Sequence, residues 1–316
     1  MRAVTGGSQR TNRAPFALVA PFVPQGIHSA VDTGFVWLDG SLVPRSDARI
    51  SAEDWGFLYG DTLFETVRVV SGKPLAWKEH MERWRKSARL LNYRFDVASE
   101  PVLDALRQTL AANRLTDAVA RITLTRGRNP HGFRLRDCTD AKLIIAVRPF
   151  DAATEAQVQR GMRLRTVRVP EREGWPRYRT KSGNYLDFLL ALDTAFDAGA
   201  DEALLVDRRN RVLEGARSNF FLVTQDRLLT PPVRLGILPG VMRGLVIRWA
   251  RREGITTSTR PILRQSLLRA TEAFVTNSVW GIVPVLSIDG RALGPSVPGP
   301  VAQRLLARHD RWVRGG

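Results

Sequence analysis

The chain has 316 residues, of which 44% are hydrophobic, 25% charged and 8% aromatic. This composition is ordinary for a globular protein and excludes a disordered chain, a collagen and a disulfide-stapled mini-protein. At roughly 150 residues per domain, the length predicts about two domains.

The formal net charge of +17 raises the question of a nucleic-acid partner. The excess is almost entirely arginine, because the chain has 43 arginines and only five lysines. These residues are spread over the whole length, and aromatic residues are not interleaved with a basic strip, so no nucleic-acid partner is expected. A basic nucleic-acid-binding protein remains an alternative, and an even positive charge can also steer small anions toward the protein.

The single cysteine, Cys138, excludes an internal disulfide framework and predicts a reducing, cytoplasmic location. The four histidines stand far apart, without a cysteine partner or H-x-x-x-H spacing, so no metal site is predicted. Residues 1–30 are basic and then mildly apolar, and prolines interrupt the apolar run. We expect a disordered or loosely packed tail there, and no membrane span, because nothing approaches ~20 consecutive apolar residues.

Regular patterns begin at Gly34, where alternating apolar residues flank an Asp39-Gly40 pair and predict a hairpin with a two-residue loop. Periodicity then predicts a strand, two helices and two strands, over 63–72, 77–91, 102–115, 120–127 and 142–150. This series constitutes a predicted small domain over residues 31–149.

After Phe150 the chain turns polar and alanine-rich, which predicts an interdomain linker over 150–156 and a larger domain over 157–316. The larger domain is expected to contain strands over 162–169, 219–223 and 272–277, a hairpin over 202–215, and helices over 185–199, 241–254 and 301–309. Strands and helices do not alternate strictly, so the predicted fold class is α+β. Dinucleotide-binding G-x-G-x-x-G and Walker patterns are absent from the sequence.

Lys181 is the only lysine in the second half of the chain. A deprotonated lysine amine can attack a carbonyl to form a Schiff base, which an arginine cannot do. Arg177 and Arg179 would lower the pKa of this lysine if they fold close to it. A lysine exposed at a helix N-terminus is the alternative that the residues alone leave open.

Several segments, in the same order, resemble the class IV aminotransferases, which are fold-type IV pyridoxal 5'-phosphate (PLP) enzymes. They are DWGFLYGDTLFETVRV, EHMERWRKSA, RTKSGNYLDFLLAL, EGARSNFFLV, and the pair ILPGVMR and VTNSVWGIVPV. The matches extend from Asp54 to Val285, and an ordered set is far more specific than any one motif. The resemblance implies two domains, a small α/β sandwich and a larger pseudo-barrel, and a homodimer in which a loop of the neighbouring subunit completes each site.

The resemblance also implies roles around the cofactor ring. Lys181 matches the lysine that binds PLP covalently and moves protons at the substrate carbon. Glu214 matches the acid that pairs with the pyridine nitrogen, and its alternative is a charge that closes the preceding hairpin. Tyr185 matches a residue near the ring oxygen.

On the phosphate side, Arg83 matches the arginine that grips the cofactor phosphate, where a bidentate fork suits the anion. An ordinary solvated helix face is its alternative. Val241 and Met242, which follow Gly240, match a helix start whose backbone N–H groups bind phosphate. Ser278 matches a hydroxyl that adds a further bond to it.

On the substrate side, strand alternation puts Phe64, Thr66 and Arg68 on one face, and the resemblance places this face at the substrate. Thr66 is predicted to act on the leaving group, and its alternative is a β-branched strand residue. The loop TRGRNPHGF roughly resembles carboxylate-binding loops of the D-amino-acid branch, which makes three further residues candidates for substrate binding: Arg126, Arg128 and His131. Arg217 occupies a motif position at which the family often has a small residue.

Three subclasses remain: 4-amino-4-deoxychorismate lyases, D-amino-acid transaminases and branched-chain aminotransferases. Thr66 in FETVR, the spacing from Lys181 to Asn184, and Met242 in GVMR point away from the branched-chain pattern. The segments GVMR and NSVWGIVPV, preceded by TPP, most resemble the lyases, which make 4-aminobenzoate and pyruvate for folate biosynthesis. We therefore predict a lyase, with a D-amino-acid, broad-specificity or branched-chain transaminase as the alternative; in either case the substrate is a small molecule with an amino group.

Overall fold

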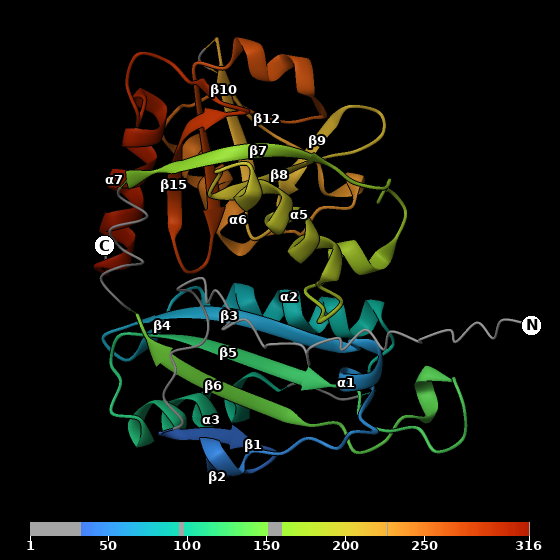
Figure 1. The fold of residues 1–316 in the computed structure, drawn as a ribbon. Helices are drawn as coiled ribbons and strands as arrows, with labels where there is room; N and C mark the ends of the chain where they lie inside the picture. Colours follow the sequence, from blue (N-terminus) through green and yellow to red (C-terminus); the bar gives the residue numbers. More distant parts are fainter. Residues whose placement is uncertain (1–32, 95–97, 151–159, 226, 316) are drawn as a thin grey trace, which may run out of the picture.

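The computed structural model describes residues 33–94, 98–150, 160–225 and 227–315. Within these ranges the chain forms a six-stranded and a ten-stranded sheet, each flanked by helices (Figure 1). The strands of the first sheet end at Pro149, and those of the second begin at Met162. The predicted tail over 1–30 and most of the predicted linker over 150–156 lie outside the described residues, so these limits stay predictions.

The six-stranded sheet has the order β2-β1-β6-β5-β3-β4, and every neighbouring pair is antiparallel. Its strands are β1 (Phe35–Leu38), β2 (Ser41–Pro44), β3 (Thr62–Val70), β4 (Lys73–Pro74), β5 (Ala118–Thr125) and β6 (Leu143–Pro149). The turn between β1 and β2 has positive φ at both Asp39 and Gly40, as the Asp-Gly pair predicts.

Side-chain alternation gives this sheet two different faces. One face packs under α2 (Trp77–Leu90) and α3 (Ser99–Ala112), and its core includes Leu63, Val67 and Val69 of β3. The opposite face contributes Phe64 and Thr66 to a cavity that also borders the second sheet. Strand period therefore decides which β3 residues reach the site.

The ten-stranded sheet is mixed, with β7 parallel to both β8 and β15, and β11 parallel to β12. The order is β12-β11-β10-β14-β15-β7-β8-β9-β13, with β16 paired to β15. The strands are β7 (Met162–Arg168), β8 (Glu202–Val206), β9 (Arg211–Gly215), β10 (Asn219–Thr224), β11 (Arg227–Thr230), β12 (Thr257–Thr259), β13 (Ile262–Leu263), β14 (Glu272–Asn277), β15 (Gly281–Ile288) and β16 (Arg291–Ala292).

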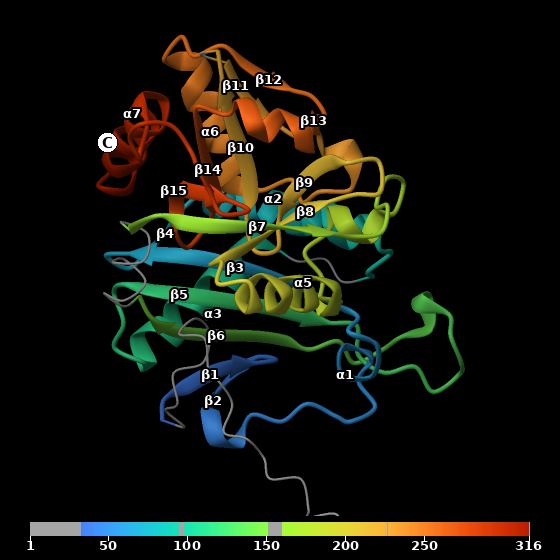
Figure 2. The ribbon, with the colours of Figure 1, turned by 45° about the horizontal axis from the view of Figure 1, so that its top comes forward.

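Three longer helices accompany this sheet: α5 (Leu186–Asp197), α6 (Val241–Arg252) and α7 (Pro300–Val313). Figures 1 and 2 place α5 on the side of the large sheet that faces β3. Helices α6 and α7 pack on Phe221, Phe274 and Ile282 in a core of their own. The other helices within the described ranges are α1 (Trp55–Tyr59) and the 3-10 turns η1 (Arg45–Asp47), η2 (Leu135–Asp137), η3 (Pro176–Arg179), η4 (Val233–Leu235) and η5 (Arg264–Arg269).

The predicted α+β class with two unequal sheet-and-helix units is confirmed. Periodicity did not predict α1, because a helix of five residues is too short to show a helical period. Asp54 stabilises this short helix by accepting a hydrogen bond from the Gly56 N–H. Periodicity also did not predict β15 as a strand, since the run GIVPV is too short and too uniformly apolar to show a period. Among the described residues, no helix is long and apolar enough to cross a membrane.

Candidate active site

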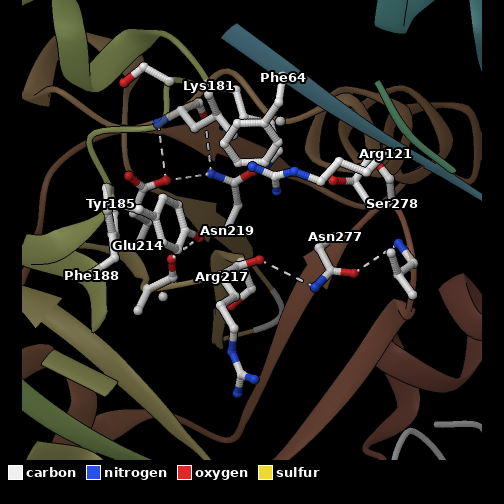
Figure 3. Close-up of a pocket in the computed structure, with 18 of the residues that line it drawn as sticks. Phe64, Arg121, Lys181, Tyr185, Phe188, Glu214, Arg217, Asn219, Asn277 and Ser278 are labelled. Carbon is white, nitrogen blue, oxygen red and sulfur yellow. Dashed lines mark hydrogen bonds between the residues drawn. The ribbon is translucent and has the colours of Figure 1, made fainter. Parts of the chain in front are cut away.

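A cavity of about 910 Å³ lies between the two sheets. The small sheet lines it with residues of β3, β5 and β6, and the rest of the chain adds the segment before α5, the β9–β10 loop, the start of α6 and the β14–β15 turn. Segments far apart in the sequence thus meet at one place. Figure 3 shows the central side chains of this cavity.

Lys181 enters the cavity from an extended segment that pairs with the start of β3. The Phe64 N–H donates to the Lys181 carbonyl at 2.8 Å, and Nζ lies 4.6 Å from the centre of the Phe64 ring. Loss of hydration, followed by the charge of Arg83, lowers the pKa of this lysine to about 8. Unlike an exposed lysine, Lys181 therefore has an appreciable fraction of nucleophilic amine near neutral pH.

Glu214 is the penultimate residue of β9, lines the cavity and is 3% exposed. Its Oε2 accepts hydrogen bonds from the Leu238 N–H at 3.0 Å and from Asn219 Nδ2 at 3.1 Å, whereas Oε1 has no hydrogen-bond donor among the described residues. Burial raises the pKa of Glu214 to about 7. An orphaned buried carboxylate oxygen at a cavity wall suits a cationic ring N–H of a ligand.

The start of α6 offers an anion site. Val241 and Met242 line the cavity as the first two helical residues, and first-turn N–H groups have no acceptor within their own helix. Gly240 must lack a side chain, because a Cβ there would lie 1.8 Å from Asn219 Oδ1. Ser278, in the β14–β15 turn, lines the same cavity.

Arg83 lies at the cavity wall and points from α2 toward β3. Its Nε donates to Glu65 Oε1 at 2.9 Å, and Nη2 also bonds Glu65, whose Oε2 contacts His80 Nδ1 at 2.7 Å. Burial alone would raise the pKa of Glu65, but Arg83 and His80 hold it at about 2. The helix face is therefore not solvated at Arg83, which is 8% exposed.

Tyr185 lies immediately before α5 and donates its hydroxyl to the Ala216 carbonyl at 2.8 Å. Its ring stacks on Phe188 with centroids 4.8 Å apart. Burial, together with the charges of Glu202 and Glu214, raises the pKa of this phenol. Tyr185 is thus a neutral donor at the same wall as Glu214.

A residue that the sequence analysis did not single out, Arg121 of β5, is central to the small-sheet wall. It is the direct β-sheet partner of Thr66, and its guanidinium lies 3.7 Å from the centre of the Phe64 ring. Within the described part of the chain it has no carboxylate partner and no hydrogen-bond acceptor, and loss of hydration lowers its pKa. In the strand run ARITLTRG, alternation puts Arg121 on the face of Thr123 and Thr125, opposite the apolar residues Ala120, Ile122 and Leu124. A charged residue in the middle of such a strand was the signal that sequence analysis could have used.

Four predicted substrate-binding residues do not line this cavity. Arg68 shares a face with Thr66 but lies further along β3, where Nη1 bonds the Ala118 carbonyl at 3.2 Å and Nη2 contacts Asp117 at 3.3 Å. Arg126 is buried elsewhere, ion-paired with Asp61 and 3.9 Å above the Tyr93 ring.

Arg128 and His131 lie on the loop after β5. Arg128 is half exposed and contacts Asp140 at 3.2 Å, and the backbone N–H of the exposed His131 donates to Asn129 at 2.8 Å. These two residues, like Arg68 and Arg126, therefore do not line the pocket of this chain, and their role in substrate binding stays a prediction. Each guanidinium has protein partners that hold it away from the cavity.

Arg217 lines the cavity but is directed away from Glu214, as Figure 3 shows. Its Nη2 donates to the Asp201 carbonyl at 2.9 Å, and its guanidinium lies 5.0 Å from the Trp280 ring centre. Asn277 connects this loop to the β14–β15 turn, since its Nδ2 donates to the Arg217 carbonyl at 3.3 Å and its Oδ1 accepts from the Trp280 N–H at 2.8 Å. Asn277 therefore fixes the turn that presents Ser278.

The cavity has the donor and acceptor set that PLP requires. Lys181 supplies an amine, Glu214 an unpaired oxygen for a ring nitrogen, and the start of α6 a set of free N–H groups for a phosphate. Thr276 Oγ1, buried beside Ser278 and without a partner among the described residues, is one more polar atom at this wall. The same residues contain no group of three or more His, Cys, Asp or Glu that could hold a metal ion.

Comparisons with the sequences of known proteins agree with this chemistry. A sequence model of the Amino-transferase class IV family matches residues 62–288. A candidate branched-chain-amino-acid aminotransferase of Methanocaldococcus jannaschii is 35% identical over 270 residues, which is 85% of this chain and 93% of the relative.

Solved structures agree as well. The branched-chain aminotransferase of the thermophilic archaeon Thermoproteus uzoniensis, solved with norvaline, superposes with a TM-score of 0.81 at 29% identity, covering 90% of this chain and 95% of that one. A candidate 4-amino-4-deoxychorismate lyase of Legionella pneumophila superposes with a TM-score of 0.77 at 29% identity, covering 84% and 95%. The chain belongs to the class IV aminotransferase family of PLP-dependent enzymes.

Proposed function

We propose that this enzyme is a 4-amino-4-deoxychorismate lyase that releases 4-aminobenzoate and pyruvate. The observation that supports it is the pairing of Thr66 and Arg121 on the cavity wall next to Phe64. The substrate has one amine and two carboxylates, so it needs a cation without a carboxylate partner and a hydroxyl close to the bond that breaks. Arg121 and Thr66 supply these groups side by side.

When bound, PLP supplies an electron sink for charge that develops at the carbon beside the amino nitrogen. Lys181, with its pKa near 8, is the base that removes the proton from that ring carbon. The C–O bond to the enolpyruvyl group then breaks, and the ring becomes aromatic. The Thr66 hydroxyl hydrogen-bonds the departing group or relays a proton to it.

Arg121 binds a substrate carboxylate through its fork while its flat face rests on the Phe64 ring. The ring restricts the position of the guanidinium and leaves its N–H donors available for the substrate. Glu214, Tyr185, Arg83, Ser278 and the start of α6 are proposed to hold the cofactor ring and phosphate.

Transamination of amino acids is the second candidate, and the similarity to aminotransferases in sequence and structure favours it. In that reaction Lys181 would shift a proton at the α-carbon of an amino acid, and Arg121 would bind a carboxylate of the substrate. The two candidates share the cofactor site and differ in whether an acceptor 2-oxo acid is needed.

The deciding experiment is an assay of purified holoenzyme. With 4-amino-4-deoxychorismate alone, we expect pyruvate and 4-aminobenzoate in equal amounts. Parallel assays contain D-alanine, D-glutamate or L-leucine, each with a 2-oxo acid acceptor. Amino-group exchange without pyruvate release from 4-amino-4-deoxychorismate would reject the lyase and leave the transaminase.

The proposal includes a homodimer in the cytoplasm. Large apolar side chains are exposed on α1 and α5, where Phe57 is 73%, Leu186 65% and Leu190 59% exposed. Patches of this kind suit an interface between subunits. The buried free thiol of Cys138 suits a reducing compartment.

A further inference from the structure

Arg172 is a fully buried arginine in the segment between β7 and η3, behind the cavity. It is 1% exposed, and Nε, Nη1 and Nη2 are all buried without a hydrogen-bond acceptor among the residues that the structure describes. A buried cation normally has several acceptors, because leaving its N–H groups unpaired costs free energy for each group. A purely structural arginine would not be built in this way.

Aromatic rings and backbone fix the position of this guanidinium. Its Cζ lies 4.5 Å from the ring centres of both Tyr178 and Phe188. Gly236 packs so closely on the backbone of Arg172 that a Cβ at position 236 would lie 2.4 Å from the Arg172 carbonyl oxygen. The rings allow the positive charge to remain buried while they offer no hydrogen-bond acceptor in place of a carboxylate.

The nearest anionic group is the orphaned oxygen of Glu214, because Nη1 of Arg172 lies 3.8 Å from Oε1. This separation is too long for a hydrogen bond but short enough for a strong electrostatic interaction in a buried site. Arg172 therefore acts on the charge of Glu214 and leaves the lone pairs of Oε1 available.

Three other titratable groups act on the same carboxylate. Lys181 and Arg243 favour its ionised form, and Tyr185 faces it as a neutral phenol. Burial is the dominant effect and raises the pKa of Glu214, while Arg172 is the strongest opposing influence. Arg172 therefore shifts the equilibrium of this carboxyl group toward its ionised form.

We infer that Arg172 is a positioning residue that keeps Glu214 ionised, with Oε1 free, so that the ring nitrogen of the cofactor stays protonated. A hydrogen-bonded arginine would occupy Oε1 and compete with the ring N–H. The inference rests on the proposed placement of the ring nitrogen at Glu214, and it holds equally for a lyase and a transaminase.

The test measures the protonation of the ring nitrogen directly. Holoenzyme is reconstituted with PLP labelled with ¹⁵N in the ring, and the ¹⁵N chemical shift is followed between pH 6 and 9. In Arg172→Met we expect the ring nitrogen to lose its proton at a pH at least about one unit lower than in the wild type, a tenfold change in the ionisation constant. Arg172→Lys, which keeps the charge, should restore part of the difference.

Two further variants separate this inference from the proposed cofactor placement. Glu214→Gln should deprotonate the ring nitrogen over the whole range; if its ¹⁵N shift equals that of the wild type, the nitrogen does not lie at Glu214 and both proposals fail. If Glu214→Gln changes the shift and Arg172→Met does not, the role of Arg172 alone is wrong.

Thermal unfolding of the cofactor-free protein distinguishes positioning from structural support. Because Arg172 donates no hydrogen bond to any residue that the structure describes, Arg172→Met should leave the Tm of the apoprotein within a few degrees of the wild type. Arg243→Met is the matched control, since Arg243 is also buried near Glu214 but donates to the Pro231 carbonyl at 2.8 Å and to Thr230 Oγ1 at 3.2 Å, so its loss should lower the Tm. If Arg172→Met does not fold, Arg172→Gln is the variant for the ¹⁵N measurement. The inference would be overturned if the ring nitrogen in Arg172→Gln lost its proton at the same pH as in the wild type.

Discussion

Thr66 and Arg121 are direct cross-strand partners on β3 and β5, 55 positions apart in the sequence, and both line the cavity that contains Lys181. Their pairing brings a hydroxyl and a guanidinium to one patch of wall beside the Phe64 ring. Four predictions about the cavity and one about the surface follow from the positions of these and neighbouring residues.

Thr66→Val removes the hydroxyl and keeps the shape of the side chain. We expect pyruvate release from 4-amino-4-deoxychorismate to slow by about 10- to 100-fold, because a positioned proton donor contributes at least that much. PLP binding should not change. Thr123→Val is the matched control, since Thr123 lies opposite Phe64 on β5 but does not line the cavity; equal rates in the two variants would leave Thr66 as a simple strand residue.

Arg121→Met removes the cation and keeps most of the length. The kcat/KM for a carboxylate-bearing substrate should fall by about 100-fold, which corresponds to ~3 kcal/mol for a lost charge-assisted hydrogen-bond pair. Steady-state kinetics measures this change in kcat/KM. Arg107→Met on α3, where an exposed Arg107 contacts Asp104 at 3.0 Å, controls for the loss of one positive charge and should keep wild-type kinetics. An unchanged kcat/KM in Arg121→Met would exclude it from substrate binding.

Lys181 should react with PLP in a pH-dependent way. Because its pKa is lowered to about 8, the rate of PLP incorporation into apoprotein should rise with pH up to about 8 and then level off. Borohydride reduction and peptide mass mapping should place the pyridoxyl group on Lys181. Lys142→Arg is the control, since hydrogen bonds to Asp140 and Asp39 raise the pKa of the Lys142 amine; a label on Lys142 would contradict the assignment.

Arg83→Gln should weaken PLP binding by about 10- to 100-fold, because a guanidinium–phosphate contact is charge-assisted. Fluorescence titration of apoprotein with PLP measures the Kd. Lys86→Gln, on the exposed face of the same helix, should bind PLP like the wild type. If both variants bound PLP with the wild-type Kd, the proposed binding of the cofactor phosphate by Arg83 would be rejected.

Leu186→Glu should convert the proposed dimer to a monomer, because it places a charge on an apolar side chain that is 65% exposed at the start of α5. Light scattering gives the mass of each species. Leu268→Glu on η5, where the leucine is 60% exposed, is the control and should remain dimeric. A fully active wild-type monomer would refute the dimer itself.

Much of the fold could be predicted from local sequence patterns. The Asp39-Gly40 turn, the alternation along β3 and the apolar stripe of α2 depend on residues within a few positions of one another. The same holds for the segment around Lys181 and for Glu214 with its neighbours, so sequence motifs were sufficient to select these residues as candidates.

The selection of arginines needed the tertiary structure. Among 43 arginines, a rough resemblance of the loop TRGRNPHGF made Arg126 a candidate for substrate binding, but the fold buries it against Asp61 and Tyr93. Arg121 reaches the cavity only through the register of β3 with β5, and Arg172 approaches Glu214 only because two aromatic rings and Gly236 fix its path. The sequence by itself determined the local elements and the motif residues, since these depend on short-range periodicity. Long-range strand register and burial decided which charges are neutralised by protein partners and which remain for a ligand.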